Sequence, residues 1–240
     1  MIRDDSIFYR LPHELDRKQA LFLDGIRHAI EITDLAYRRL QHTLTKIALD
    51  ESVTSSRTYA AAYLDAWAMV DAVDRFRALV AFVDDARKGN SSERISKSGQ
   101  LLESVRNLRN VADHLAQRAD YVVAHKGSAL GSLSWFTITD QASYKGVLCV
   151  VVPGTTQPST HPAPVPAGKE VDFPTGYVHL RAGEYLVDLS GVHRFIREEC
   201  NLLEDALEAA ISRAGLAGSR AGSDLIIKGT ITFRPDQCDA

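Results

Sequence analysis

Residues 23–47 read LDGIRHAIEITDLAYRRLQHTLTKI, and this stretch decides how we expect the chain to fold. Side chains that suit a protein interior recur there every three or four positions, at Leu23, Ile26, Ile30, Thr33, Tyr37, Leu40, Leu44 and Ile47. Because an α-helix turns once in about 3.6 residues, this spacing places them on one side of a helix. The stretch therefore predicts a long amphipathic helix, which we expect to begin near Pro12 because proline suits a first helical turn.

Three further segments have helical character. Together with the first helix, the predicted helices cover residues 12–48, 57–87, 95–125 and 192–212. In the third, the apolar stripe includes Leu108, Ala112 and Leu115, and Ser190 is a suitable N-cap for the fourth. Each helix has an apolar side that needs a partner, so we expect a four-helix bundle formed by residues 11–126 and 191–213.

The sequence changes character between the third and fourth helices, where residues 130–190 are rich in β-branched and aromatic side chains and in turn formers. Predicted strands cover residues 133–139, 147–152, 177–181, 184–189 and 225–233. Prolines are concentrated in residues 153–174, which predicts an extended surface loop. The expected fold is thus mainly α, a single domain over residues 1–240, in which the bundle carries a small antiparallel sheet inserted between helices three and four. A C-terminal strand within the β-rich residues 223–235 completes it.

Composition and charge exclude several classes of protein. The chain has 240 residues, of which 45% are hydrophobic and 25% charged, as in ordinary globular proteins. Its formal net charge of −3 provides no general field for holding a polyanion, so contact with nucleic acid would have to be local. The three cysteines lack a Cys-x-x-Cys pair, and no apolar stretch is long enough to cross a bilayer. We therefore expect a cytoplasmic protein with no membrane association.

The segment with the most specific chemistry is Arg109-Asn110-Val111-Ala112-Asp113-His114 in the third predicted helix. Histidine can move protons and arginine can hold a phosphate, which are the two needs of catalysis at a phosphodiester. An Arg-Asn-x-x-x-His string should arise by accident in roughly one such chain in a hundred. Helical spacing places Asn110 and His114 on the outer face, Arg109 on the flank and Arg106 beside Asn110.

Two other interpretations of the histidines and charged residues remain open. The residues of this segment can simply form a solvated helix face, which is the common role of charged helical positions. Alternatively, His28, His114 and His193 on three helices can hold a metal if the fold brings them together, although nothing in the sequence requires it. The Glu-x-x-His pattern of di-iron bundles, the phosphate-binding glycine loop and the Gly-x-Ser-x-Gly elbow are all missing.

The string from Arg109 to His114, placed on a late helix of a predicted four-helix bundle, resembles the signature of the HEPN (higher eukaryotes and prokaryotes nucleotide-binding) superfamily. The family pattern is an arginine, a polar residue that is often asparagine, three variable residues and a histidine. Many members are metal-independent ribonucleases of toxin–antitoxin, abortive-infection and other defence systems, and others have lost catalysis. The resemblance covers the helical residues and leaves the β-rich segment outside.

By this resemblance, His114 is the candidate for proton transfer, Arg109 for contact with the phosphate, and Asn110 for orienting one of them; Arg106 is a candidate substrate contact. Sites of this family are usually assembled from two copies in a homodimer. The resemblance thus implies an endoribonuclease without a cofactor, acting on RNA, with an antitoxin or another defence protein as a candidate partner. The alternative is a non-catalytic helical dimer that serves as an interaction or nucleotide-binding module.

Overall fold

The computed structural model describes residues 1–50, 52, 55–84, 92–117, 119–124, 128–143, 145–154, 163–166, 171–219 and 224–230. The elements are η1 (Ile7–Tyr9), α1 (Arg17–Leu49), α2 (Ser56–Asp84), α3 (Ser92–Asp113), α4 (Ala119–Ala124), β1 (Ser132–Asp140), β2 (Lys145–Val151), β3 (Thr175–Ala182), β4 (Tyr185–Asp188) and α5 (Leu189–Arg213). The prediction of a mainly helical protein with a small antiparallel sheet is confirmed. None of the described helices is sufficiently long and apolar to cross a membrane.

Helix α1 has the predicted apolar side, and its buried residues include Ile26, Ile30, Leu40 and Leu44. It begins at Arg17, so the expected start near Pro12 is wrong. The side chain of Asp16 accepts hydrogen bonds from the backbone N–H groups of residues 18 and 19, at 3.0 and 3.2 Å. These N–H groups have no partner within the helix, and an aspartate N-cap satisfies them.

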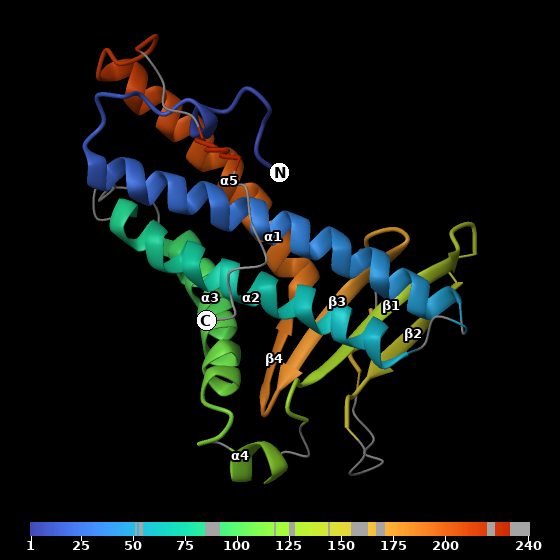
Figure 1. Ribbon diagram of the computed structural model, residues 1–240. Coiled ribbons are helices and arrows are strands. Elements are labelled where there is room, and N and C mark those ends of the chain that lie inside the picture. Colours follow the sequence, from blue (N-terminus) through green and yellow to red (C-terminus); the bar gives the residue numbers. More distant parts are fainter. Residues whose placement is uncertain are drawn as a thin grey trace, which may run out of the picture.

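Helices α1 and α2 form an antiparallel hairpin, which Figure 1 shows as the blue and teal helices above the sheet. Helix α5 crosses α1 and also packs on β3. Its N-cap is Asp188, which accepts a hydrogen bond from the backbone N–H of Gly191 at 2.9 Å. The prediction of Ser190 as the cap is wrong because its hydroxyl instead accepts hydrogen bonds from Tyr37 and from the backbone of Val178.

The predicted third helix is two helices in the structure. Helix α3 ends at Asp113, residues 114–117 form a turn, and the short α4 follows, so the described part of the chain has five α-helices. In the turn, the backbone N–H of Leu115 bonds to the carbonyl of Ala112 at 3.2 Å, three positions away. Helix α4 is anchored elsewhere, since the hydroxyl of Tyr121 accepts a hydrogen bond from the backbone of Glu184 at 3.2 Å.

The four strands form one antiparallel sheet in the order β2-β1-β3-β4. All four strands expected before the last helix are present, and the predicted hairpin is β3 and β4. The final predicted strand, 225–233, is wrong where it can be checked, because residues 225–230 form no strand; residues 231–233 lie outside the described part. Most of the predicted loop at 153–174 also lies outside it.

The sheet and the helices share one hydrophobic cluster, which includes Trp135 of β1, Leu180 of β3, Leu108 of α3 and Ile30 of α1. The buried side chain of Tyr63 in α2 connects the sheet to the α1–α2 hairpin by hydrogen bonds. Its hydroxyl lies 2.8 Å from the carbonyl oxygen of Val151 and 3.2 Å from the backbone nitrogen of Leu133. A buried tyrosine hydroxyl needs such partners, so these bonds define how the sheet sits against α2.

Candidate functional site

The Arg109–His114 segment lies at the C-terminal end of α3. Among the residues of this helix whose burial is described, Val105, Leu108 and Val111 are buried in the core. Ala112, which we expected on the core side, is only half-buried. This rotation leaves Arg106 and His114 exposed, as the helical spacing indicates, but it turns Asn110 partly inward, to a half-buried position. His114 lies just past the end of the helix and not within it.

Arg109 is held by carboxylates. Its Nε atom lies 2.8 Å from Asp71 Oδ1 and 3.5 Å from Asp113 Oδ2, and its Nη1 atom lies 2.7 Å from Asp74 Oδ2. The hydrogen bond to Asp74 is the main cause that raises the pKa of Arg109. Within the described residues, the hydrogen bonds of Arg109 are made by Nε and Nη1, and its side chain is 38% exposed.

Asp74 is the best buried of these carboxylates, with a side chain only 10% exposed. It also accepts a hydrogen bond from Arg77 Nε at 2.8 Å. Burial alone would raise the pKa of Asp74, but the bonds from Arg77 and Arg109 lower it below its ordinary value. Asp74 is therefore a fixed anion that ties α3 to α2 through Arg109.

The ring of His114 is oriented by the turn that follows α3. Its Nδ1 atom lies 2.8 Å from Gln117 Oε1. In the tautomer that carries its proton on Nδ1, the neutral ring donates to the Gln117 amide oxygen and Nε2 has a lone pair. Since the side chain is exposed, this nitrogen can take a proton from a substrate hydroxyl.

The structure thus adds partners that sequence reasoning missed. Asp71 and Asp74 come from α2, and their three-residue spacing, which places both on one helix face, was the only signal. Gln117 follows the segment by three positions and could be recognised only once the helix was known to end. Arg106 pairs with Glu103, one turn earlier on α3, at 3.7 Å.

The histidine triad considered from sequence does not form. His28 lies 3.3 Å from Glu31 and 3.6 Å from Asp24, while His114 bonds to Gln117. His193 Nε2 lies 2.9 Å from Asp34 Oδ1, and its buried Nδ1 atom has no hydrogen-bond partner among the residues that the structure describes. Each ring therefore belongs to a different local network.

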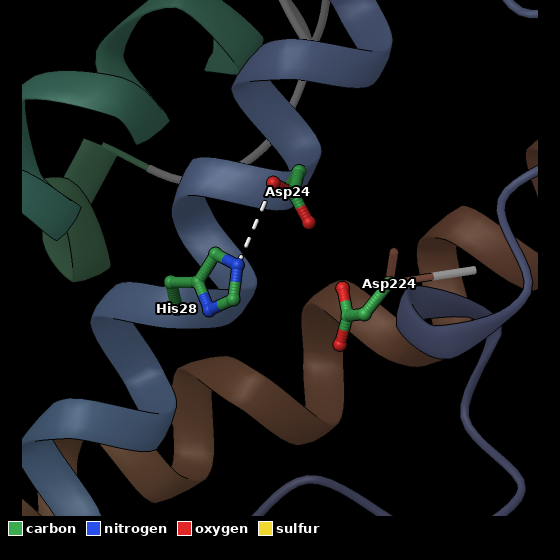
Figure 2. Close-up of side chains that lie close together, drawn as sticks. All are labelled: Asp24, His28 and Asp224. Carbon is green, nitrogen blue, oxygen red and sulfur yellow. Dashed lines mark ion pairs between the residues drawn. The ribbon is translucent and has the colours of Figure 1, made fainter. Parts of the chain in front are cut away.

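Figure 2 shows a different group that resembles a metal site, with Asp24 and His28 on α1 facing Asp224 from the C-terminal segment. One ligand atom from each lies within 4.8 Å of the others. However, Nη2 of Arg27 lies 2.8 Å from Asp24, 3.0 Å from His28 and 2.7 Å from Asp224. A guanidinium already occupies the position of a cation, so we do not assign a metal to this group.

No family model matches the chain, and neither a curated protein nor a solved structure matches it. The chemistry of the α3 end therefore has to be argued from its own atoms.

Proposed function

We propose that this protein is a metal-independent endoribonuclease of HEPN type and that the C-terminal end of α3 is its catalytic site. The observation that carries the proposal is the hydrogen bond between His114 Nδ1 and Gln117 on an exposed side chain; in the tautomer that donates from Nδ1, Nε2 serves as the base. A base of this kind is what cleavage of RNA without a metal requires. By the same resemblance, we propose a toxin or phage-defence role, with an antitoxin or defence protein as its partner.

In the proposed reaction, Nε2 of His114 removes the proton of a ribose 2′-hydroxyl. The 2′-oxygen then bonds to the adjacent phosphorus, and the bond from phosphorus to the 5′-oxygen breaks. The leaving 5′-oxygen takes up a proton, and the products are a 2′,3′-cyclic phosphate and a 5′-hydroxyl. Nη2 of Arg109 contacts the phosphate oxygens as negative charge develops on them, and Arg106 binds the neighbouring backbone. Asn110 orients these groups.

This reaction needs one group to accept a proton and another to donate one. By the HEPN resemblance the site is assembled from two copies, so that His114 of one copy accepts the proton of the 2′-hydroxyl and the protonated His114 of the other donates one to the leaving 5′-oxygen. The exposed position of His114 is compatible with a second α3 docking beside the first. We therefore propose a homodimer whose two-fold axis passes near His114, and we expect light scattering to give twice the mass of the chain.

The carboxylates around Arg109 compete with the RNA phosphate for its charge. Asp71 and Asp113 have side chains that are 55% and 50% exposed, so they can be displaced at little cost. Asp74 is buried and keeps Arg109 in place while a phosphate binds Nη2. The arginine is thus positioned by one carboxylate and made less available by the other two.

The deciding experiment is cleavage of a labelled RNA by the purified full chain in the presence of EDTA. Wild type should cleave, whereas His114→Ala and Arg109→Ala should each lose about a hundredfold or more. His42→Ala is the matched control, because His42 is an exposed helical histidine of α1, and it should cleave like wild type. Cleavage that disappears with EDTA and returns with a divalent ion would contradict the mechanism.

A second function is favoured by one observation, the bonds from Arg109 to Asp71 and Asp74. These bonds give the arginine a structural task in joining α3 to α2. In this alternative the protein is a non-catalytic helical dimer that serves as an interaction or nucleotide-binding module of a defence or regulatory complex. Under this alternative, wild type should leave RNA intact. Arg109→Ala should lower the stability of the protein and change no RNA cleavage.

A further inference from the structure

A pocket of about 850 Å³ is lined by the N-terminal segment, the first turns of α1 and residues 224–225. None of its lining residues belongs to α3. Its wall is partly apolar and includes Phe8, Leu11, Leu15 and Leu21. The volume is in the range of pockets that hold small organic molecules. Charged side chains also line the pocket, and the buried one among them is Arg27; the others are Arg17, Asp24 and Asp224.

Arg27 is almost fully buried, with 4% of its surface exposed. Its Nη1 and Nη2 atoms donate to the two oxygens of one carboxylate, that of Asp224, at 3.3 and 2.7 Å. Its Nε atom bonds to Asp24 from the previous turn of α1 at 3.2 Å. The edge of the guanidinium formed by Nη1 and Nη2 therefore has the geometry to bind a planar carboxylate through two parallel hydrogen bonds.

The carboxylate that now occupies this edge is weakly anchored. The side chain of Asp224 is 77% exposed, although its partner is buried. The next three residues, Leu225, Ile226 and Ile227, are 83%, 76% and 85% exposed, so little apolar burial holds the segment against the body of the protein. Another carboxylate can replace Asp224 without breaking up a packed element.

We propose that this pocket binds a small monocarboxylate with an apolar body, whose carboxylate replaces that of Asp224 on Arg27. The exchange leaves the charge around Arg27 unchanged, because one single negative charge replaces another. A dianion fits less well, since Asp24 and Glu31 already lie beside Arg27, at 2.8 and 3.8 Å. The apolar body lies along Leu21, which is 67% exposed, and so removes hydrophobic surface from water.

The test uses the full chain, octanoate as the ligand and isothermal titration calorimetry at pH 7.5. Octanoate should bind wild type at least about tenfold more tightly than octan-1-ol, which has the same chain but no carboxylate. Asp224→Asn should bind octanoate about two- to fivefold more tightly, because it removes an exposed competing ion pair. Asp205→Asn is the matched control: Asp205 is 67% exposed and pairs with Arg3 at 3.0 Å, outside the pocket.

Equal affinities for octanoate and octan-1-ol would overturn the proposal, as would absence of octanoate binding to Asp224→Asn. Equal octanoate affinities of Asp224→Asn and Asp205→Asn would overturn the claim that Asp224 is the internal competitor. Arg27→Gln should lose the preference for octanoate over the alcohol. If Arg27→Gln prevents folding, the octanoate affinities of Asp224→Asn and Asp205→Asn still test whether the ligand replaces Asp224. No RNA enters this assay, so its outcome is independent of the proposed ribonuclease activity.

Discussion

Asp34 Oδ1 lies 2.9 Å from His193 Nε2, and this contact joins α1 to α5 across 159 positions of sequence. The ring of Tyr37 stacks on His193 with the ring centroids 4.1 Å apart. Asp34 also pairs with Arg38 at 2.9 Å, so its carboxylate is a shared anion of the helix interface. A charge in such a place makes the stability of the protein depend on pH.

Asp34→Asn should lower the free energy of unfolding by about 2 kcal/mol at pH 7. Burial by itself would raise the pKa of Asp34, but the bond from His193 and the positive charges of the N-terminus and Arg38 lower the pKa to about 2. A carboxylate with a lowered pKa stabilises the folded state above its unfolded pKa, near 4. The difference between the variant and wild type should therefore shrink as the pH falls from about 4 to about 2, as measured by urea unfolding at each pH.

The control for that series is Asp120→Asn, which changes an exposed carboxylate on α4. It should stay within about 0.5 kcal/mol of wild type at pH 7. A deficit of Asp34→Asn that is the same at pH 2 as at pH 7 would show that the carboxylate charge does not stabilise the α1–α5 contact.

Arg109→Ala and His114→Ala should differ in stability. Removing Arg109 leaves the buried carboxylate of Asp74 paired with Arg77 alone of its two arginines. We therefore expect the free energy of unfolding to fall by about 1–2 kcal/mol. His114 is exposed, and among the described residues it bonds to Gln117 of the same turn, so its loss should cost about 0.5 kcal/mol or less. Leu108→Ala, at a fully buried position, should cost about 2–5 kcal/mol. Urea unfolding ranks all three, and equal effects of the first two would contradict the structural role of Arg109.

Asp71→Asn should increase RNA cleavage. The substitution removes an exposed carboxylate that bonds to Arg109 Nε and competes with the phosphate. Exposed ion pairs contribute about 0.2–1 kcal/mol, so we expect a rise in kcat/KM of up to about fivefold. The measurement is initial cleavage rate at low RNA concentration, with Asp120→Asn as the control. A decrease would mean that Asp71 positions the arginine and does not compete for it.

Gln117→Ala should lower kcat by about tenfold and leave KM nearly unchanged. The glutamine touches His114 and not the substrate, so it is a positioning residue whose loss frees the ring to rotate and change tautomer. Gln117→Glu should retain more activity than the alanine variant, because a carboxylate also accepts a hydrogen bond from Nδ1. A KM effect without a kcat effect would place Gln117 in RNA binding instead.

The local features of the fold could be predicted from the sequence, and the long-range ones could not. The apolar side of α1 depends on residue spacing, and the strands near 133–139 and 147–152 depend on their β-branched and aromatic side chains; both signals are visible in one chain. The break after Asp113 has no glycine or proline to mark it, and the bond between Tyr121 and Glu184 that anchors α4 is distant in sequence. Residues 225–227 have strand-forming side chains, but side-chain preference cannot supply a partner strand.

The same limit applies to the α3 end. Helical spacing was enough to expect exposed Arg106 and His114, and the structure has both on the surface. The carboxylates around Arg109 were not foreseen because Asp71 and Asp74 belong to another helix. Whether an arginine is available to a ligand depends on such neighbours, and they are known only when the helices have been placed.

The arrangement of the helices also has a consequence for the order in which the chain folds. Helices α1 and α2 are neighbours in sequence and form a hairpin, so bringing them together costs little loop-closure entropy. Contact between α5 and α1 closes a much longer loop, because 159 positions separate Asp34 from His193. The hairpin should therefore supply an early nucleus, while docking of α5 determines the slower part of the folding rate.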